Sequence, residues 1–142
     1  MEPIKGFFEE YRWLSNFWKA DVEFESYIYP TVEHAYQAAK SFDERVRQRL
    51  CDSTIAAGQV KRMGRTFDLR PDWEGVKVDI MKQLLHSKFQ NPELRAKLLE
   101  TGTRPLEETN TWGDTYWGVF KGKGQNMLGK LLMGIRTELM EA

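Results

Sequence analysis

Two stretches of the chain carry the clearest helical pattern of apolar residues. The longer stretch begins after Asp72 and ends near Phe89, and its apolar positions are Trp73, Val76, Ile80, Leu84 and Leu85. The other begins near Gln125, and its apolar positions are Met127, Leu128, Leu131, Leu132, Ile135 and Leu139. Residues three and four apart share one face of a helix, so each stretch predicts a helix with one buried side.

Capping residues predict four more helices. Short polar side chains accept hydrogen bonds from the first free N–H groups of a helix, and glycine commonly ends one. A proline just after the cap is also typical of a helix start. The predicted helices are 32–41 after Thr31, a short one from Asp43 to Cys51, one from Ser53 to Gly64 that buries Ile55, Ala56, Val60 and Met63, and one from Asn91-Pro92 to Gly102.

A short segment favours β-structure instead. Val22, Phe24, Tyr27 and Tyr29 lie in a β-prone segment whose alternation slips once. This pattern predicts a strand or hairpin edge that ends at Pro30. Residues 105–119 are expected to be irregular or extended. We therefore expect a mainly α (α+β) fold, a single compact domain over 1–142 with helices around a small β element.

Composition narrows the functional classes. The chain has 142 residues, and 21 Lys and Arg balance 21 Asp and Glu, so the formal net charge is zero. This excludes a protein that coats nucleic acid or an anionic membrane by bulk charge, but it is compatible with a local basic pocket. One cysteine, Cys51, excludes an internal disulfide and favours a reducing, cytoplasmic compartment. Neither a membrane-spanning run nor the apolar core of a signal peptide is found, so no membrane partner is expected.

The predicted helix over 32–41 places a carboxylate and an amine on one face. Glu33, then Tyr36 or Gln37, then Lys40 are three to four residues apart. Two interpretations are open. This face is solvated and carries an ordinary ion pair, or it faces a pocket lined by the aromatic N-terminal segment. In the second case a desolvated Lys40 acts as a nucleophile, and Glu33 moves its protons.

Two irregular segments near the last helix carry further candidate chemistry. Residues 121–126 (Lys-Gly-Lys-Gly-Gln-Asn) lead into that helix, where free N–H groups suit a phosphate, although a simple turn is the alternative. Residues 108–118 crowd acids, amides and tryptophans into one loop. Indole faces suit a base and carboxylates suit ribose hydroxyls. The alternative is that Trp112 and Trp117 are core residues at a chain reversal.

Other polar residues are weaker candidates. Ser15 and Asn16, near Arg12, are suited to fix a base edge or phosphate, or to cap a turn. In the basic set Lys61, Arg62, Arg65 and Arg70, only Arg65 beside Gly64 is expected to reach a phosphate. The two histidines, His34 and His86, lack metal-ligand spacing, so no zinc site and no cofactor is expected. His34 is expected at a helix surface or core edge.

Taken in order, these motifs resemble one family. They are Arg12-Trp13-Leu14-Ser15-Asn16-Phe17, the run from Tyr29 to Lys40, Gly64-Arg65, Asp72-Trp73, Lys88-Phe89, the run from Glu108 to Asp114, Trp117-Gly118, and the run from Gly124 to Gly129. The chain is identified as a member of the NADAR (YbiA-like) superfamily, and the resemblance extends from Phe7 to Arg136. It implies a single NADAR-like domain with N-glycosidase activity at ribose C1.

The resemblance implies two substrate classes, both of them glycosylamines of an exocyclic nitrogen. One is guanine that carries ADP-ribose on its exocyclic amine, free or within DNA or RNA. The other is a phosphoribosylaminopyrimidine intermediate of riboflavin synthesis. The runs 35–40 and 110–114 look closer to members that act on ADP-ribosylated guanine, whereas 117–126 departs from the riboflavin-linked pattern by being shorter. A non-catalytic module that binds ADP-ribose is a third alternative, and an ADP-ribosyltransferase toxin partner and the oligomeric state stay open.

The resemblance also implies a set of site residues. Lys40 would exchange its amine with that of the base to form a Schiff base, and Glu33 would move protons. Alternatively, Glu33 or Asp114 assists direct attack by water. The expected catalytic residues are Glu33, Lys40 and Asp114. The expected substrate-binding residues are Arg12, Ser15, Asn16, Phe17, Tyr36, Arg65, Glu108, Asn110, Trp112, Trp117, Gly118, Gly124 and Asn126.

Overall fold

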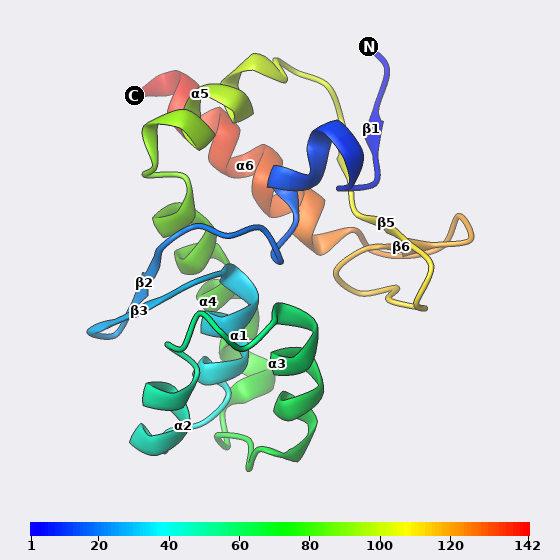
Figure 1. Cartoon of the computed structure of the whole chain (residues 1–142). Helices are drawn as coiled ribbons and strands as arrows, with labels where there is room; N and C mark the ends of the chain where they lie inside the picture. Colours follow the sequence, from blue (N-terminus) through cyan, green and yellow to red (C-terminus); the bar gives the residue numbers. More distant parts are fainter. The chain divides into compact units, whose positions relative to one another are not determined.

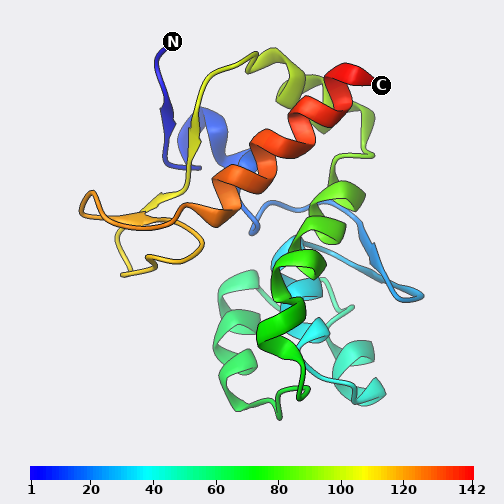
Figure 2. The same cartoon turned by 180° about the vertical axis from the view of Figure 1, so that it is seen from behind.

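The chain divides after Ser15 and again after Asn91. Unit 1 consists of residues 1–15 and 92–142, and unit 2 consists of residues 16–91. The computed structural model describes every residue from 1 to 142, and Figures 1 and 2 show it from opposite sides. A single domain over 1–142 stays a prediction.

Unit 2 begins with a β-hairpin. Strand β2 (Val22–Phe24) pairs antiparallel with β3 (Tyr27–Tyr29), and Val22 lies opposite Tyr29. The two turn residues, Glu25 and Ser26, have φ angles of +45° and +76°, as two-residue hairpin turns require. The slip in the apolar alternation falls at this turn, so the expected β element is a hairpin.

The helices of unit 2 begin largely where their caps predict. Thr31 Oγ1 accepts a hydrogen bond from the His34 N–H at 3.0 Å, and Asp43 accepts from Arg45 N–H at 2.9 Å. The predicted cap at Ser53 is wrong, because Asp52 binds the N–H of Thr54 and holds a turn there. The elements are α1 (Val32–Ala39), α2 (Glu44–Arg49), α3 (Ala57–Met63), the 3-10 helix η2 (Gly64–Thr66) and α4 (Trp73–Lys88).

Helix α1 occupies the centre of unit 2. It packs against α2, α3, α4 and both hairpin strands, and all of its residues from Val32 to Ala39 are buried. Figures 1 and 2 both show α1 flanked by α3 and α4. Its small residues Ala35, Ala38 and Ala39 let the neighbouring elements approach closely. The polar side chains of this helix are therefore held inside the unit.

Unit 1 is built from both ends of the chain. Strand β1 (Ile4–Lys5) pairs parallel with β4 (Leu106–Glu107), and β5 (Thr109–Asn110) pairs parallel with β6 (Val119–Phe120). A 3-10 helix that the sequence did not predict, η1 (Glu9–Leu14), follows β1. The predicted helices are α5 (Pro92–Glu100) and α6 (Met127–Glu141), and α6 packs against α5 and β4.

These elements confirm the mainly α (α+β) class. Helices supply most of the regular structure, and each of the three sheets has only two strands. None of the helices combines the length and the apolar character that crossing a membrane requires.

Candidate active site

Glu33 is buried in the centre of unit 2. Its side chain is 7% exposed, and Gln37, one turn later on α1, is 3% exposed. The Glu33 N–H donates to the carbonyl of Asn16 at 3.1 Å, and Gln37 Nε2 donates to Glu33 Oε1 at 2.8 Å. A carboxylate held in this way is not on a solvated face, so that interpretation of the α1 pattern is wrong.

Lys40 closes the same face of α1 at the end of the helix. It is half-buried, it makes no hydrogen bond or ion pair through its side chain, and Nζ lies 5.4 Å from the centre of the Tyr36 ring. Burial lowers the pKa of Lys40; the negative charge of Glu33 opposes that shift, whereas Lys61, Arg65 and Lys77 add to it. Such a lysine is a better nucleophile than a solvated one, because more of it is the neutral amine.

Tyr36 and His34 hold α1 in place. The Tyr36 ring is buried and lies 5.1 Å from the Trp73 ring, centre to centre. His34 Nε2 donates to the Ile55 carbonyl at 2.7 Å, and Nδ1 lies 2.7 Å from Thr31 Oγ1. Burial lowers the pKa of His34, so the ring is neutral and both nitrogens are used. His34 is thus buried and not at a helix surface.

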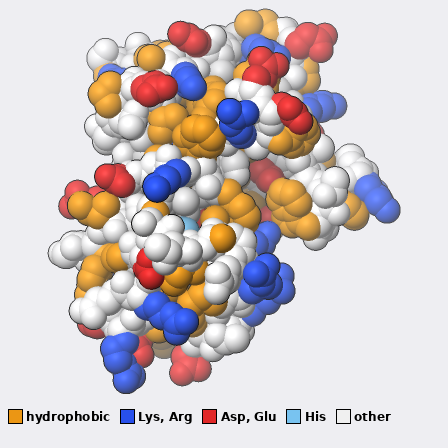
Figure 3. All heavy atoms as spheres, in the orientation of Figure 1, with side chains coloured by type: hydrophobic (Ala, Val, Ile, Leu, Met, Phe, Trp, Pro, Cys, Tyr) orange, Lys and Arg blue, Asp and Glu red, His pale blue; other side chains and the backbone are white.

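The other predicted residues of unit 2 lie nearer its surface. Asn16 is half-buried and contacts Met81 Sδ through Nδ2 at 3.7 Å. Phe17 is 46% exposed and lies against Gly58, and Arg65 is exposed on η2. Figure 3 shows Lys and Arg side chains gathered over α3, the helix that carries Lys61 and Arg62. Unit 2 thus brings together Asn16, Glu33, Tyr36 and Lys40, with cationic charge nearby.

In unit 1, Asp114 and Asn110 organise a loop. Asp114 Oδ1 accepts from the N–H groups of Tyr116 and Trp117 at 3.0 and 2.9 Å. Asn110 Oδ1 accepts from Asp114 N–H at 3.0 Å, and Asn110 Nδ2 donates to the Asp114 carbonyl and to Glu108 Oε2. These bonds fold 108–118 onto itself. The second carboxylate oxygen of Asp114 makes no hydrogen bond.

Gly118 and Asn126 complete the loop. A Cβ at Gly118 would overlap the carboxylate and carbonyl oxygens of Glu108 and lie 2.6 Å from Asn110 Nδ2, so only glycine fits. Asn126 has φ of +53°; its Oδ1 accepts from the Glu108 N–H and its Nδ2 donates to the Leu106 carbonyl, both at 2.9 Å. Asn126 therefore joins the start of α6 to the strand region.

The N–H groups at the start of α6 are already used. Those of Gln125, Asn126, Met127 and Leu128 donate to the carbonyls of Thr115, Gly118, Tyr116 and Trp117, at 2.8 to 3.2 Å. These four N–H groups are therefore not free to bind a phosphate, and phosphate binding by residues 121–126 stays a prediction. Substrate binding by Gly124 and Asn126 stays a prediction. Gly124, with φ of +150°, lies so close to the Gly118 carbonyl that a side chain would collide with it.

The remaining predicted residues of unit 1 differ in exposure. Trp112 is 60% exposed beside Gly113, so the interpretation of Trp112 as a core residue is wrong. Trp117 is half-buried, edge-on to Tyr116 with ring centres 5.0 Å apart. Arg12 is exposed and donates to the Glu9 carbonyl at 3.2 Å. Ser15 is half-buried after η1, and its N–H donates to the Arg12 carbonyl.

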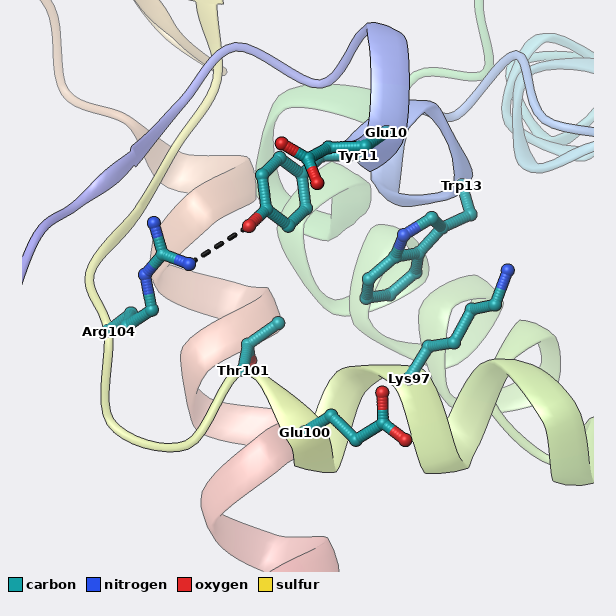
Figure 4. A pocket seen from close by; sticks show the side chains of 7 residues that line it. All are labelled: Glu10, Tyr11, Trp13, Lys97, Glu100, Thr101 and Arg104. Atoms are coloured by element: carbon teal, nitrogen blue, oxygen red, sulfur yellow. Dashed lines mark hydrogen bonds between the residues drawn. The ribbon is translucent and has the colours of Figure 1, made fainter.

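A separate cavity of 320 Å³ lies within unit 1 (Figure 4). Arg104 borders it and donates to the Tyr11 hydroxyl at 2.9 Å and to the Glu2 carbonyl at 2.8 Å. None of the sequence-predicted site residues lines this cavity, so we do not assign it to the site. The lining residues are Glu10, Tyr11, Trp13, Lys97, Glu100, Thr101 and Arg104.

Sequence reasoning missed the roles of three residues around Lys40. Lys61 and Lys77 act electrostatically on Lys40 from α3 and α4, and no sequence signal joins them to it. Gln37 was noted only as an alternative to Tyr36 on the helix face, yet it binds Glu33 directly. Its spacing, four residues after Glu33, was the available signal. No three His, Cys, Asp or Glu side chains cluster in a way that would hold a metal ion.

Comparisons with known proteins agree over nearly the whole chain. The family model described as NADAR domain matches residues 5–140. The N-glycosidase YbiA of Escherichia coli is 41% identical over 135 residues, which cover 92% of this chain and 83% of that protein. A riboflavin biosynthesis protein of Vibrio vulnificus is 35% identical over 94% of this chain, which corresponds to 37% of that longer protein. The solved structure of the E. coli protein YbiA superimposes with a TM-score of 0.86 at 38% identity, covering 99% of this chain and 86% of that one.

Proposed function

This chain belongs to the NADAR domain family, and on that premise we propose that it is an N-glycosidase acting on the C1–N bond of a glycosylamine. The observation that carries the proposal is the pairing on α1 of a buried carboxylate, Glu33, with a half-buried lysine that has no ion pair, Lys40. The similarity to the E. coli N-glycosidase supports it. The family match spans both units, which supports one functional domain over 1–142.

Lys40 is the proposed nucleophile. The sugar of a glycosylamine opens to an imine at C1, and the neutral Lys40 amine adds to that carbon. Expulsion of the base as its free amine leaves a Lys40 Schiff base, and water then hydrolyses this imine to release the sugar and restore the lysine. Each step moves a proton, and Glu33 is the proposed acid and base for these transfers.

A non-covalent route uses the carboxylates alone. Glu33, or the free oxygen of Asp114, would assist direct attack of water on C1. The two routes differ in what they need from Lys40, because only the covalent route requires its neutral amine. The lowered pKa of Lys40 and its lack of an ion pair favour the covalent route.

ADP-ribosylated guanine is the first proposed substrate. The exposed indole of Trp112 is suited to stack on a base, and Arg65 and the other cations around Lys40 are suited to phosphate oxygens. The remaining proposed binding residues are Arg12, Ser15, Asn16, Phe17, Tyr36, Glu108, Asn110, Trp117, Gly118, Gly124 and Asn126. A phosphoribosylaminopyrimidine is the second candidate, and the similarity to a riboflavin biosynthesis protein favours it.

A direct assay separates these candidates. The protein is incubated with an oligonucleotide that carries ADP-ribosylated guanine and, in parallel, with a ribosylaminopyrimidine phosphate. We expect free ADP-ribose from the first. Release from the pyrimidine alone would transfer the assignment to the second substrate. Tight binding of ADP-ribose without turnover of either substrate would leave a non-catalytic binding module.

Borohydride tests the covalent route. Reduction during turnover is expected to fix the sugar to the wild-type protein, and mass spectrometry should locate the adduct on Lys40. The Lys40→Ala variant should form no adduct, whereas Lys61→Ala, which removes a neighbouring amine, should still form it. Turnover without a trapped adduct would favour direct attack by water.

A further inference from the structure

The side-chain amide of Gln37 has a fixed orientation. An ionised carboxylate only accepts hydrogen bonds, so the NH₂ group of Gln37 must face Glu33, which it reaches at 2.8 Å. The carbonyl end, Oε1, then points away from Glu33. It is buried and has no hydrogen-bond partner. A buried acceptor without a partner lowers the free energy of unfolding. This orientation of the Gln37 amide therefore destabilises the fold.

Gly64 provides the space for that amide. A Cβ at position 64 would overlap Gln37 Oε1 and lie 2.6 Å from Gln37 Cδ. The backbone of Gly64 has φ of −59° and ψ of −23°, a right-handed conformation that any residue adopts. Glycine at position 64 therefore makes room for the Gln37 amide in its observed position, and the turn of the chain does not require it.

We propose that Gln37, seated against Gly64, is a positioning residue that orients the Glu33 carboxylate for proton transfer. The inference rests on the proposed function, because it assigns Glu33 its task. Gln37 binds Oε1 of Glu33 and fixes the plane of the carboxylate. Its N–H also favours the ionised form of Glu33 over the protonated form.

Charged groups on the neighbouring elements also act at this face. Lys61 on α3, Arg65 on η2 and Lys77 on α4 lower the pKa of Lys40, whereas the negative charge of Glu33 raises it, so Glu33 and Lys40 interact electrostatically. On α2, Arg47 is paired with Glu25 from the hairpin turn. Burial raises the pKa of Tyr29 on β3, so that residue stays neutral. Loss of the Gln37 hydrogen bond should shift the titration of Glu33 to higher pH, because that bond favours the ionised form.

The Gln37→Leu variant tests the role with a side chain of similar size and no N–H. We expect kcat to fall by about ten- to a hundredfold with little change in KM. The acidic limb of the pH profile should move to higher pH by about one unit. The matched control is Gln59→Leu, the same change at an exposed position on α3, which should leave the profile unchanged. A loss that is equal at every pH would overturn the proposal in favour of simple packing.

The Gly64→Ala variant tests the hydrogen bond between Gln37 and Glu33 without changing either residue. The new methyl group should push the flexible Gln37 amide off Glu33 and reproduce the shifted profile. In the Gln37→Ala background the methyl group has room, so Gln37→Ala/Gly64→Ala should be no worse than Gln37→Ala alone. Additive losses would show that Gly64 acts independently of Gln37, and the proposal would fail.

A measurement without substrate separates this proposal from the proposed function. The carboxyl carbon of Glu33 is followed by NMR through a pH titration of the wild type and Gln37→Leu. A higher midpoint in the variant supports the positioning role even if neither substrate is hydrolysed, in which case only the assigned activity fails. Equal midpoints overturn the role even if the enzyme is active.

Discussion

Helix α1 and the 108–126 loop are both rich in polar side chains, but they use them differently. In the loop, Asp114 and Asn110 bind the backbone of the loop itself, Asn126 binds the backbone of Leu106 and Glu108, and four N–H groups at the start of α6 are occupied. On α1, Lys40 has no ion pair and Gln37 Oε1 has no partner, although both are at least half-buried. Polar groups that bind one another stabilise a shape, whereas unpartnered ones lower stability and stay available for chemistry.

The largest expected effect is a loss of activity without a loss of stability when Lys40 on α1 is replaced. Lys40→Met should lower single-turnover hydrolysis by at least about a thousandfold, because the nucleophile is lost. Thermal unfolding should stay the same or occur at higher temperature, since the ammonium removed is desolvated and unpaired. The control is Lys61→Met on α3. Full activity in Lys40→Met would contradict the proposal that α1, unlike the 108–126 loop, keeps polar groups available for chemistry.

The next effect concerns the packing of the loop. Gly118→Ala should lower the free energy of unfolding by about 1–3 kcal/mol or more, because the added methyl group overlaps Glu108. Gly134→Ala is the matched control: its Cβ meets nothing within 4 Å on α6, so helix propensity should raise stability by about 1 kcal/mol. Chemical denaturation measures the free energy of unfolding of both variants. Equal values would mean that the loop rearranges to make room for the new side chain.

A smaller effect tests whether Asp114 serves structure or chemistry. Asp114→Ala leaves two N–H groups without their acceptor and should cost about 1–3 kcal/mol. Asp114→Asn keeps an oxygen at that position and should cost less. The activity of Asp114→Asn then reports on the carboxylate alone. If Asp114→Ala were as stable as the wild type, the loop would not depend on these bonds.

The effect that is smallest per pH unit distinguishes Lys40 from another buried lysine, Lys88. Lys88 is fully buried at the end of α4, and burial lowers its pKa to about 7. Between that value and the ordinary lysine value of about 10.4, the unfolded chain binds one more proton, so stability rises with pH by up to about 1.4 kcal/mol per unit. Lys88→Met should lose this slope and keep activity. An unchanged slope in urea unfolding at pH 7 to 10 would contradict it.

Local signals in the sequence predicted much of the fold. Thr31, Asp43 and the Asn91-Pro92 pair mark helix starts correctly, because capping depends on residues next to one another. The predicted helix start at Ser53 is wrong, because the neighbouring Asp52 forms a competing turn. The parallel pairs β1–β4 and β5–β6 join short segments distant in the chain, and two-residue strands carry no periodic signal.

The site was predictable only in part, for a related reason. Helical spacing placed Glu33 and Lys40 on one face, but whether that face is buried depends on α3, α4 and the hairpin. The small residues Ala35, Ala38 and Ala39 were the available sign of close packing on every side. In the loop, no local pattern distinguishes an Asn126 that binds substrate from one that binds the Leu106 carbonyl.

The parallel pairing of β1 with β4 has a consequence for synthesis on the ribosome. Ile4 emerges early, yet its partner Leu106 is made only after all of unit 2. Closing so long a loop is entropically unfavourable until the intervening chain has become compact. Residues 16–91 are continuous, so they are able to fold as soon as they have left the exit tunnel. We therefore expect the middle of the nascent chain to fold first, while its first residues wait for a strand not yet translated.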